Sequence, residues 1–201
     1  VPNMDPERRD VAMVIGAWLW IARQTWHELD GFPEWFGSIG EDLYLCTLAR
    51  LRGMPVNVTA GSGYRHRQGA SFGGNRATTG GLQTTFRRRY LSERNKTFVL
   101  FLCTPTPAMW CLLVIHLASL FLEGLIIAAI RLDLRAFTEV YANVPRSLIR
   151  ERKRLISLRK HIQRARKVSV GAYFRVFTRL PYKLVMLFRF GIPPVSRSPA
   201  P

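Results

Sequence analysis

The residues of this chain whose types and spacing could do chemistry begin with two adjacent carboxylates. Glu41 and Asp42 follow a short segment with two glycines, Gly37 and Gly40, and precede apolar residues at helical spacing. A helix macrodipole favours acidic side chains in the first turn by about 0.3–1 kcal/mol each. The same position would fix the direction of a carboxylate that acts as a general base. The pattern alone leaves both interpretations open.

The elements that must position this pair can be read from the neighbouring sequence. The apolar spacing predicts a helix over 41–52, with Arg50 and Arg52 in its last turn and Gly53 as its C-cap. Upstream, residues 11–26 predict a buried strand through Gly16 that leads into a short helix near 22–29. The carboxylates are therefore expected where a loop meets a helix.

Two loops flank this helix. The loop over 30–40 carries Phe32, Trp35 and Phe36, which either pack in the core or form a platform for a ligand. Downstream, alternation over 54–60 predicts a half-buried strand. A glycine-rich loop with Arg65, His66 and Arg67 follows it.

Several short motifs occur in a characteristic order. They are Gly16-Ala17 with Ile21-Ala22-Arg23, Gly31-Phe32-Pro33-Glu34 with Trp35-Phe36, Glu41-Asp42-Leu43, the helix end Leu48 to Gly53, His66, and Tyr90 with Arg94-Asn95. In this order they resemble the C-terminal half of the catalytic domain of family 2 inverting glycosyltransferases, particularly bacterial rhamnosyltransferase-like members that build surface polysaccharides. The resemblance covers about half of the chain.

The resemblance implies a fold and a set of roles. The fold would be α/β: the second half of a mixed GT-A sheet, followed by a helical, basic, membrane-associated extension. Asp42 would be the catalytic base and Glu41 a contact to the acceptor sugar. The implied metal ligand is His66, for Mg²⁺ or Mn²⁺. Four further residues would bind substrate, the first two near the phosphates of a nucleotide-sugar donor and the others on a sugar: Arg65, Arg67, Trp35 and Phe36.

The chain also departs from the family pattern. Pro33 stands where the family often has Asp, and no Gln-x-x-Arg-Trp signature of processive synthases is present, which favours transfer of a single sugar. No Asp-x-Asp pair occurs anywhere, although in this family that motif holds the metal and the nucleotide. We therefore expect the N-terminal nucleotide-binding half to be missing and this polypeptide alone to be inactive. The start at Val1 rather than Met also indicates a fragment.

The charge of the chain requires an anionic partner. The formal net charge is +17, and residues 131–201 hold 17 Lys and Arg against 3 Asp and Glu. Within this tail, residues 146–167 predict a basic amphipathic helix, which is typical of a membrane-surface element or an RNA binder. Its apolar stripe consists of Leu155, Leu158, Ile162 and Ala165.

An apolar segment precedes the tail. Residues 109–130 are long enough to span a bilayer, but Glu123 near the middle would cost about 2.5 kcal/mol or more there, and His116 also lies within the segment. A helical hairpin in the membrane interface is equally consistent. In it, Pro105 and Pro107 would end the preceding apolar run and Gly124 would break this one.

Together these patterns predict four regions. They are a catalytic part (1–96), an apolar membrane-associated segment (97–130), a basic helical tail (131–190) and a disordered C-terminus (191–201). The expected partners are a nucleotide-sugar donor, a saccharide or lipid-linked acceptor and an anionic membrane, at the cytoplasmic face of the bacterial inner membrane. Three cysteines within apolar stretches fit reduced thiols. The alternatives are a non-catalytic membrane-surface adaptor and, as the less favoured one, an RNA-binding protein.

Overall fold

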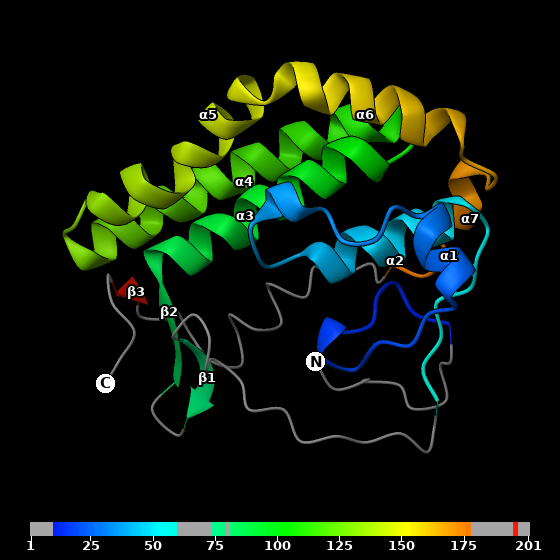
Figure 1. Ribbon diagram of the computed structural model, residues 1–201. Helices are drawn as coiled ribbons and strands as arrows, with labels where there is room; N and C mark the ends of the chain where they lie inside the picture. The colour runs from blue at the N-terminus through cyan, green and yellow to red at the C-terminus, as the bar shows by residue number, and fades with distance from the viewer. Residues whose placement is uncertain (1–9, 60–73, 79–80, 178–194, 197–201) are drawn as a thin grey trace.

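Helices dominate the structure. The computed structural model describes residues 10–59, 74–78, 81–177 and 195–196 (Figure 1). The strands assigned within these residues form one small sheet in the order β1-β2-β3, in which β1 and β2 are antiparallel and β3 is parallel to β2. Their bounds are Gly74–Thr78, Gly81–Thr85 and Val195–Ser196. The prediction of an α/β fold with a mixed GT-A sheet is therefore wrong.

The segments expected to form that sheet do not pair along their length. Val11 donates its backbone N–H to the carbonyl of Val56 at 2.9 Å, beside a single antiparallel bridge between Asp10 and Asn57. A β-ladder needs repeated bonds between neighbouring strands, and no further bridge joins the described parts of these segments. No strand is assigned over residues 11–15, and the chain enters the 3₁₀ helix η1 (Gly16–Trp18) where the strand was expected to continue.

The helices predicted around the acidic pair are confirmed. The first, α1, spans Arg23–Glu28, and the second, α2, spans Glu41–Leu51, with the 3₁₀ helix η2 (Glu34–Phe36) between them. After α2, Gly53 adopts a φ of +78°, and Met54 donates its N–H to the carbonyl of Ala49 at 2.9 Å. This is the C-cap that the glycine predicted.

Six further helices follow in the described residues. They are α3 (Phe86–Cys103), α4 (Ala108–Arg131), the π-helix η3 (Phe137–Tyr141), α5 (Asn143–Arg150), α6 (Arg152–Arg164) and α7 (Val170–Phe174). Helix α3 contacts α2, α4, η3, α5 and α6, so it is the central element (Figure 1).

One apolar core joins the two halves of the chain. Leu45 and Leu51 of α2 pack with Phe98 and Leu102 of α3 and with Leu155 of α6 in one buried cluster. The stripe that could have inserted into lipid is thus turned inward. Its members Leu155 and Ile162 are fully buried, and Leu158 packs against the same cluster.

Helix α4 is continuous through Gly124, so the predicted break there is wrong. A Cβ on Gly124 would lie 2.7 Å from the ring of Tyr141, which indicates that the glycine allows η3 to pack closely rather than ending the helix. The expected end of the preceding run is confirmed, since α3 ends at Cys103 and α4 starts after Pro107. Within the described residues, α4 alone is long and apolar enough to cross a membrane, by length and composition.

Candidate functional site

Both oxygens of the Asp42 carboxylate are held by backbone groups. One accepts a hydrogen bond from the N–H of Gly16 at 3.1 Å, and the other accepts one from the N–H of Leu43 at 2.7 Å. A Cβ on Gly16 would lie 3.4 Å from the Cβ of Asp42 and 3.9 Å from the ring of Phe32. Segments far apart in the chain therefore meet around one carboxylate. Each oxygen keeps lone-pair capacity for a further donor.

The loop before this pair has an unusual backbone. Gly37, Ile39 and Gly40 all have positive φ values, of +74°, +69° and +89°. For a β-branched residue such as Ile39 this conformation is strained, by about 1–3 kcal/mol, and persists only where surrounding structure imposes it. Such strain is characteristic of loops that hold functional groups.

Asn95 of α3 imposes this conformation. Its side chain is completely buried and donates to the carbonyl oxygens of Phe36, Ser38 and Ile39 at 3.2, 2.9 and 2.6 Å. Its Cβ would lie 3.3 Å from a Cβ placed on Gly40, so the loop runs directly over it. Asn95 is therefore a positioning residue for the start of α2.

Arg94 reinforces this contact. Its guanidinium donates to the carbonyl of Phe36 at 2.5 Å and to the side-chain oxygen of Asn95 at 2.9 Å, and it lies over the ring of Tyr90. Tyr90 in turn shares a hydrogen bond of 2.6 Å with the hydroxyl of Ser147 in α5. Tyr90, Arg94 and Asn95, which form one motif in the sequence, thus connect the loop before α2 to the C-terminal helices.

Glu41 differs from Asp42 in its surroundings. Its Oε2 atom is buried and has no hydrogen-bond partner among the described residues. Burial lowers the pKa of the Arg88 guanidinium at the start of α3, and the Glu41 carboxylate opposes this lowering. Arg88 therefore supplies positive charge beside Glu41. An unpartnered carboxylate oxygen next to a cation suits a hydroxyl donor from a ligand.

The aromatic residues divide between packing and exposure. Phe36 is 1% exposed and packs on Tyr44 and Phe98, so the structure places it in the core. Trp35 is half-buried between Phe98 and the guanidinium of Arg154. Neither ring therefore lies on an open surface.

Two exposed rings were missed by the sequence analysis. Trp18 and Trp20 are 54% and 86% exposed, and they follow directly after Gly16. Their alternation in "GAWLWIA" was the available signal, but the strand prediction assigned this whole segment to the core. They are the rings nearest in sequence to the backbone group that binds Asp42.

Three expected site residues cannot be placed. Arg65, His66 and Arg67 lie outside the described residues. In the described ranges, no group of three or more His, Cys, Asp or Glu is arranged to hold a metal ion. We therefore assign no metal ligand and derive no chemical step through a metal.

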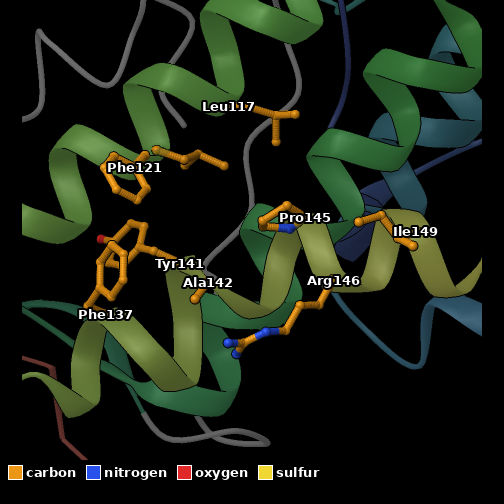
Figure 2. Close-up of a pocket in the computed structure, with 9 residues that line it drawn as sticks. Leu117, Phe121, Phe137, Tyr141, Ala142, Pro145, Arg146 and Ile149 are labelled. Carbon is orange, nitrogen blue, oxygen red and sulfur yellow. The ribbon is translucent and has the colours of Figure 1, made fainter.

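An apolar groove lies away from the acidic pair. It has a volume of about 450 Å³ between α4 on one side and η3 and α5 on the other (Figure 2). The lining residues are Leu117, Leu120, Phe121, Phe137, Tyr141, Ala142, Pro145, Arg146 and Ile149. Arg146 is the one charged residue among them, so the groove suits an apolar occupant.

Comparison of the chain with protein-family models, with curated proteins and with solved structures found no match. Function must therefore be argued from the geometry.

Proposed function

We propose that this chain contributes the acceptor side of an inverting glycosyltransferase of the family 2 type, with Asp42 as the general base. The observation that carries the proposal is the meeting of Gly16, Asp42 and Asn95 at the start of α2. These residues come from three separate segments of the resemblance. Hydrogen bonds to both oxygens fix the direction of the Asp42 carboxylate, as a base of this kind requires.

The reaction needs one proton acceptor and one leaving group. The acceptor hydroxyl passes its proton to Asp42 as its oxygen bonds to the anomeric carbon of the donor sugar. The bond from that carbon to the nucleoside diphosphate breaks, and the electron pair leaves with the diphosphate. Attack opposite the leaving group inverts the anomeric centre. Glu41 binds a second acceptor hydroxyl, and Arg88 supports Glu41 electrostatically.

The donor binds outside the residues that form this acceptor side. In the family, an Asp-x-Asp motif holds metal and nucleotide, and this sequence has none. We therefore propose that a separate nucleotide-binding half completes the enzyme and that His66, with Arg65 and Arg67, joins the site from the glycine-rich loop. A divalent metal in that half would stabilise the leaving diphosphate. The acceptor is a saccharide or a lipid-linked saccharide at the cytoplasmic face of the bacterial inner membrane.

Substitution of the base tests this proposal. In the enzyme that contains both halves, Asp42→Asn keeps the shape of the side chain and removes the base. We expect the transfer rate to fall by about 10²–10⁴-fold with little change in donor affinity. The matched control is Asp30→Asn, an exposed aspartate in the loop after α1, which should keep the wild-type rate. A near wild-type rate for Asp42→Asn would exclude it as the base.

A second candidate function is a membrane-surface adaptor without activity. The observation that favours it is the large exposed apolar face of α4. Such a face could bind a membrane surface without any catalytic site. The two candidates are separated by assaying the protein that contains both halves for release of nucleoside diphosphate from a panel of nucleotide sugars. Acceptor-dependent release that Asp42→Asn abolishes supports the transferase, whereas absence of any release supports the adaptor.

A further inference from the structure

One side of α4 is exposed and apolar along the length of the helix. Its large residues are each more than 40% exposed: Trp110, Val114, Ile115, Phe121, Leu122, Leu125, Ile126 and Ile130. At about 100° per residue they cover roughly 200° of the helix circumference. The polar residue on this arc, Ser119, donates its hydroxyl to the carbonyl of Ile115 at 2.7 Å. Exposed apolar surface of this extent marks an interaction site.

Two polar residues of α4, Glu123 and His116, contact the rest of the protein instead of lying on this arc. Glu123 pairs with Arg89 of α3 and accepts a hydrogen bond from the Tyr141 hydroxyl at 3.1 Å. His116 shares a hydrogen bond of 2.9 Å with the Thr97 hydroxyl of α3. The charge that seemed costly in the sequence is therefore neutralised within the protein. No charged side chain of α4 lies within its exposed arc.

The packing of α3 excludes a simple crossing of the bilayer by α4. The two helices pack side by side, and the linker between them is only residues 104–107. Helix α3 is also the central element against which α2, α5 and α6 pack. If α4 crossed a membrane, α3 would enter with it and bring Arg87, exposed, and Lys96, whose side chain is 49% exposed. Charged side chains are strongly disfavoured at that depth.

The α5–α6 pair runs along one edge of the exposed face. At one end Ile149 lines the groove with Leu117 of α4 (Figure 2), and at the other Arg159 donates to the Thr106 hydroxyl at 2.7 Å, just before α4. Two more apolar residues on this pair are exposed, Ile149 at 62% and Ile156 at 48%. Because Ile149 lines the groove beside α4, it extends the apolar surface beyond that helix.

Exposed cations border this surface. They are Arg131, which follows Ile130 at the end of α4, and Arg146, which lines the groove. A second copy of the chain would bring the same charges to the interface and be repelled. An anionic bilayer, in contrast, complements both the apolar face and its cationic border.

We propose that α4 lies in the plane of an anionic bilayer, with its exposed face among the acyl chains and its Glu123 side on the protein. This proposal specifies how the chain would contact the membrane named under the proposed function. It depends on that function only for the lipid-linked acceptor. The test below uses no sugar and no donor. Its failure is therefore distinct from failure of the transferase proposal.

Depth measurements along the helix test the orientation. Cys111 lies on the exposed arc, while Cys46 and Cys103 are buried, so the full chain carries a natural labelling position. Nitroxide labels go on Cys111 and, in a Cys111→Ser background, on Ala118→Cys, Leu125→Cys and Ala129→Cys. The probe is a vesicle of phosphatidylethanolamine and phosphatidylglycerol. The readout is label accessibility to oxygen against a water-soluble nickel chelate.

The two orientations give different depth profiles. An in-plane helix places all four labels at one shallow depth, although the outer two are about 27 Å apart along the axis. A spanning helix would place the labels at different depths, with the label at position 118 about 10 Å deeper than that on Cys111, which would overturn the proposal. No change in accessibility on adding vesicles would also overturn it, as would a stable dimer in solution that protects the same labels.

Vesicle co-sedimentation gives an independent test. Leu122→Glu should weaken binding of the full chain at least tenfold. Ser157→Glu, at an exposed position of α6, adds the same charge away from the apolar face and should weaken it less than threefold. Part of the wild-type protein should stay bound at about 1 M salt, where the Debye length is about 3 Å. Equal effects of the two substitutions, or complete release by salt together with tight RNA binding, would overturn the proposal.

Discussion

The contact between Asn95 and the loop before α2 can be tested by removing one side chain. Asn95→Ala deletes the donor to the carbonyls of Phe36, Ser38 and Ile39 and leaves the rest of α3 unchanged. Alanine is a better helix former than asparagine, so α3 itself should not be weakened. The loss of stability therefore reports on the loop contacts of Asn95 together with its bond to Arg94, which holds the same loop.

The magnitude follows from the geometry. The two shorter bonds, of 2.9 and 2.6 Å, are each worth about 1 kcal/mol net, and the part-buried carbonyls of Ser38 and Ile39 left without this donor add about 1–3 kcal/mol. Relaxation of Ile39 from its φ of +69° recovers part of the lost free energy of unfolding, because the strained conformation is no longer imposed. We expect a net loss of about 2–4 kcal/mol in the free energy of unfolding. For a chain of this size that lowers the Tm by roughly 5–15 °C.

Urea unfolding monitored by circular dichroism measures this loss, and amide hydrogen exchange at residues 37–43 locates it. Asn143→Ala is the matched control, since its side-chain amide donates to one carbonyl, that of Glu139, at 3.0 Å. The control should lose less than about 1 kcal/mol. A loss below about 1 kcal/mol for Asn95→Ala, or unchanged exchange at residues 37–43, would refute its positioning role.

Two further predictions concern packing and thiols. Gly124→Ala should destabilise the chain by about 1–3 kcal/mol in thermal unfolding, because the added Cβ would lie 2.7 Å from the Tyr141 ring. The control Gly171→Ala, whose added Cβ would have no atom within 4 Å, should be neutral or stabilising. Equal effects of the two substitutions would contradict the close contact. A thiol reagent at mildly alkaline pH should modify only Cys111 in the folded chain, because burial raises the pKa of the Cys46 and Cys103 thiols and shields them, and all three after unfolding. Rapid reaction of a second thiol in the folded protein would show that the core opens readily.

Local elements near the candidate site could be predicted from sequence because their signals are local. The helix over 41–52 has acids in its first turn, apolar residues at a regular spacing and a C-cap glycine, and it forms as α2. The sheet could not be predicted from the same data. Val56 is buried and hydrophobic as a strand residue would be, but a strand also needs neighbours, and the pairing found there is one bridge.

Amphipathic patterns show which face of a helix is apolar but not what covers it. Leu155 and Ile162 were expected on a face that could enter a membrane, and they lie in the protein core against α3. In α4 the outcome is reversed, since most of the apolar residues remain exposed and the buried side includes Glu123. The helix proposed to face a membrane could therefore be chosen only once the packing of both helices was known.

Helix α3 explains why so much of this arrangement escapes sequence patterns. Its buried residues include Glu93, Asn95 and Thr97, which are polar, so no apolar periodicity predicts its central place. Each of these polar groups has a structural partner. Asn95 holds the loop before the acidic pair, and Thr97 bonds to His116 of α4. Glu93 pairs with Arg89, which also pairs with Glu123 of α4. Buried polar groups are retained where they specify an arrangement that apolar packing would leave variable. One rigid helix therefore fixes both the candidate base and the proposed membrane face, so the distance of Asp42 from a bilayer is set by the fold and not by a flexible tether.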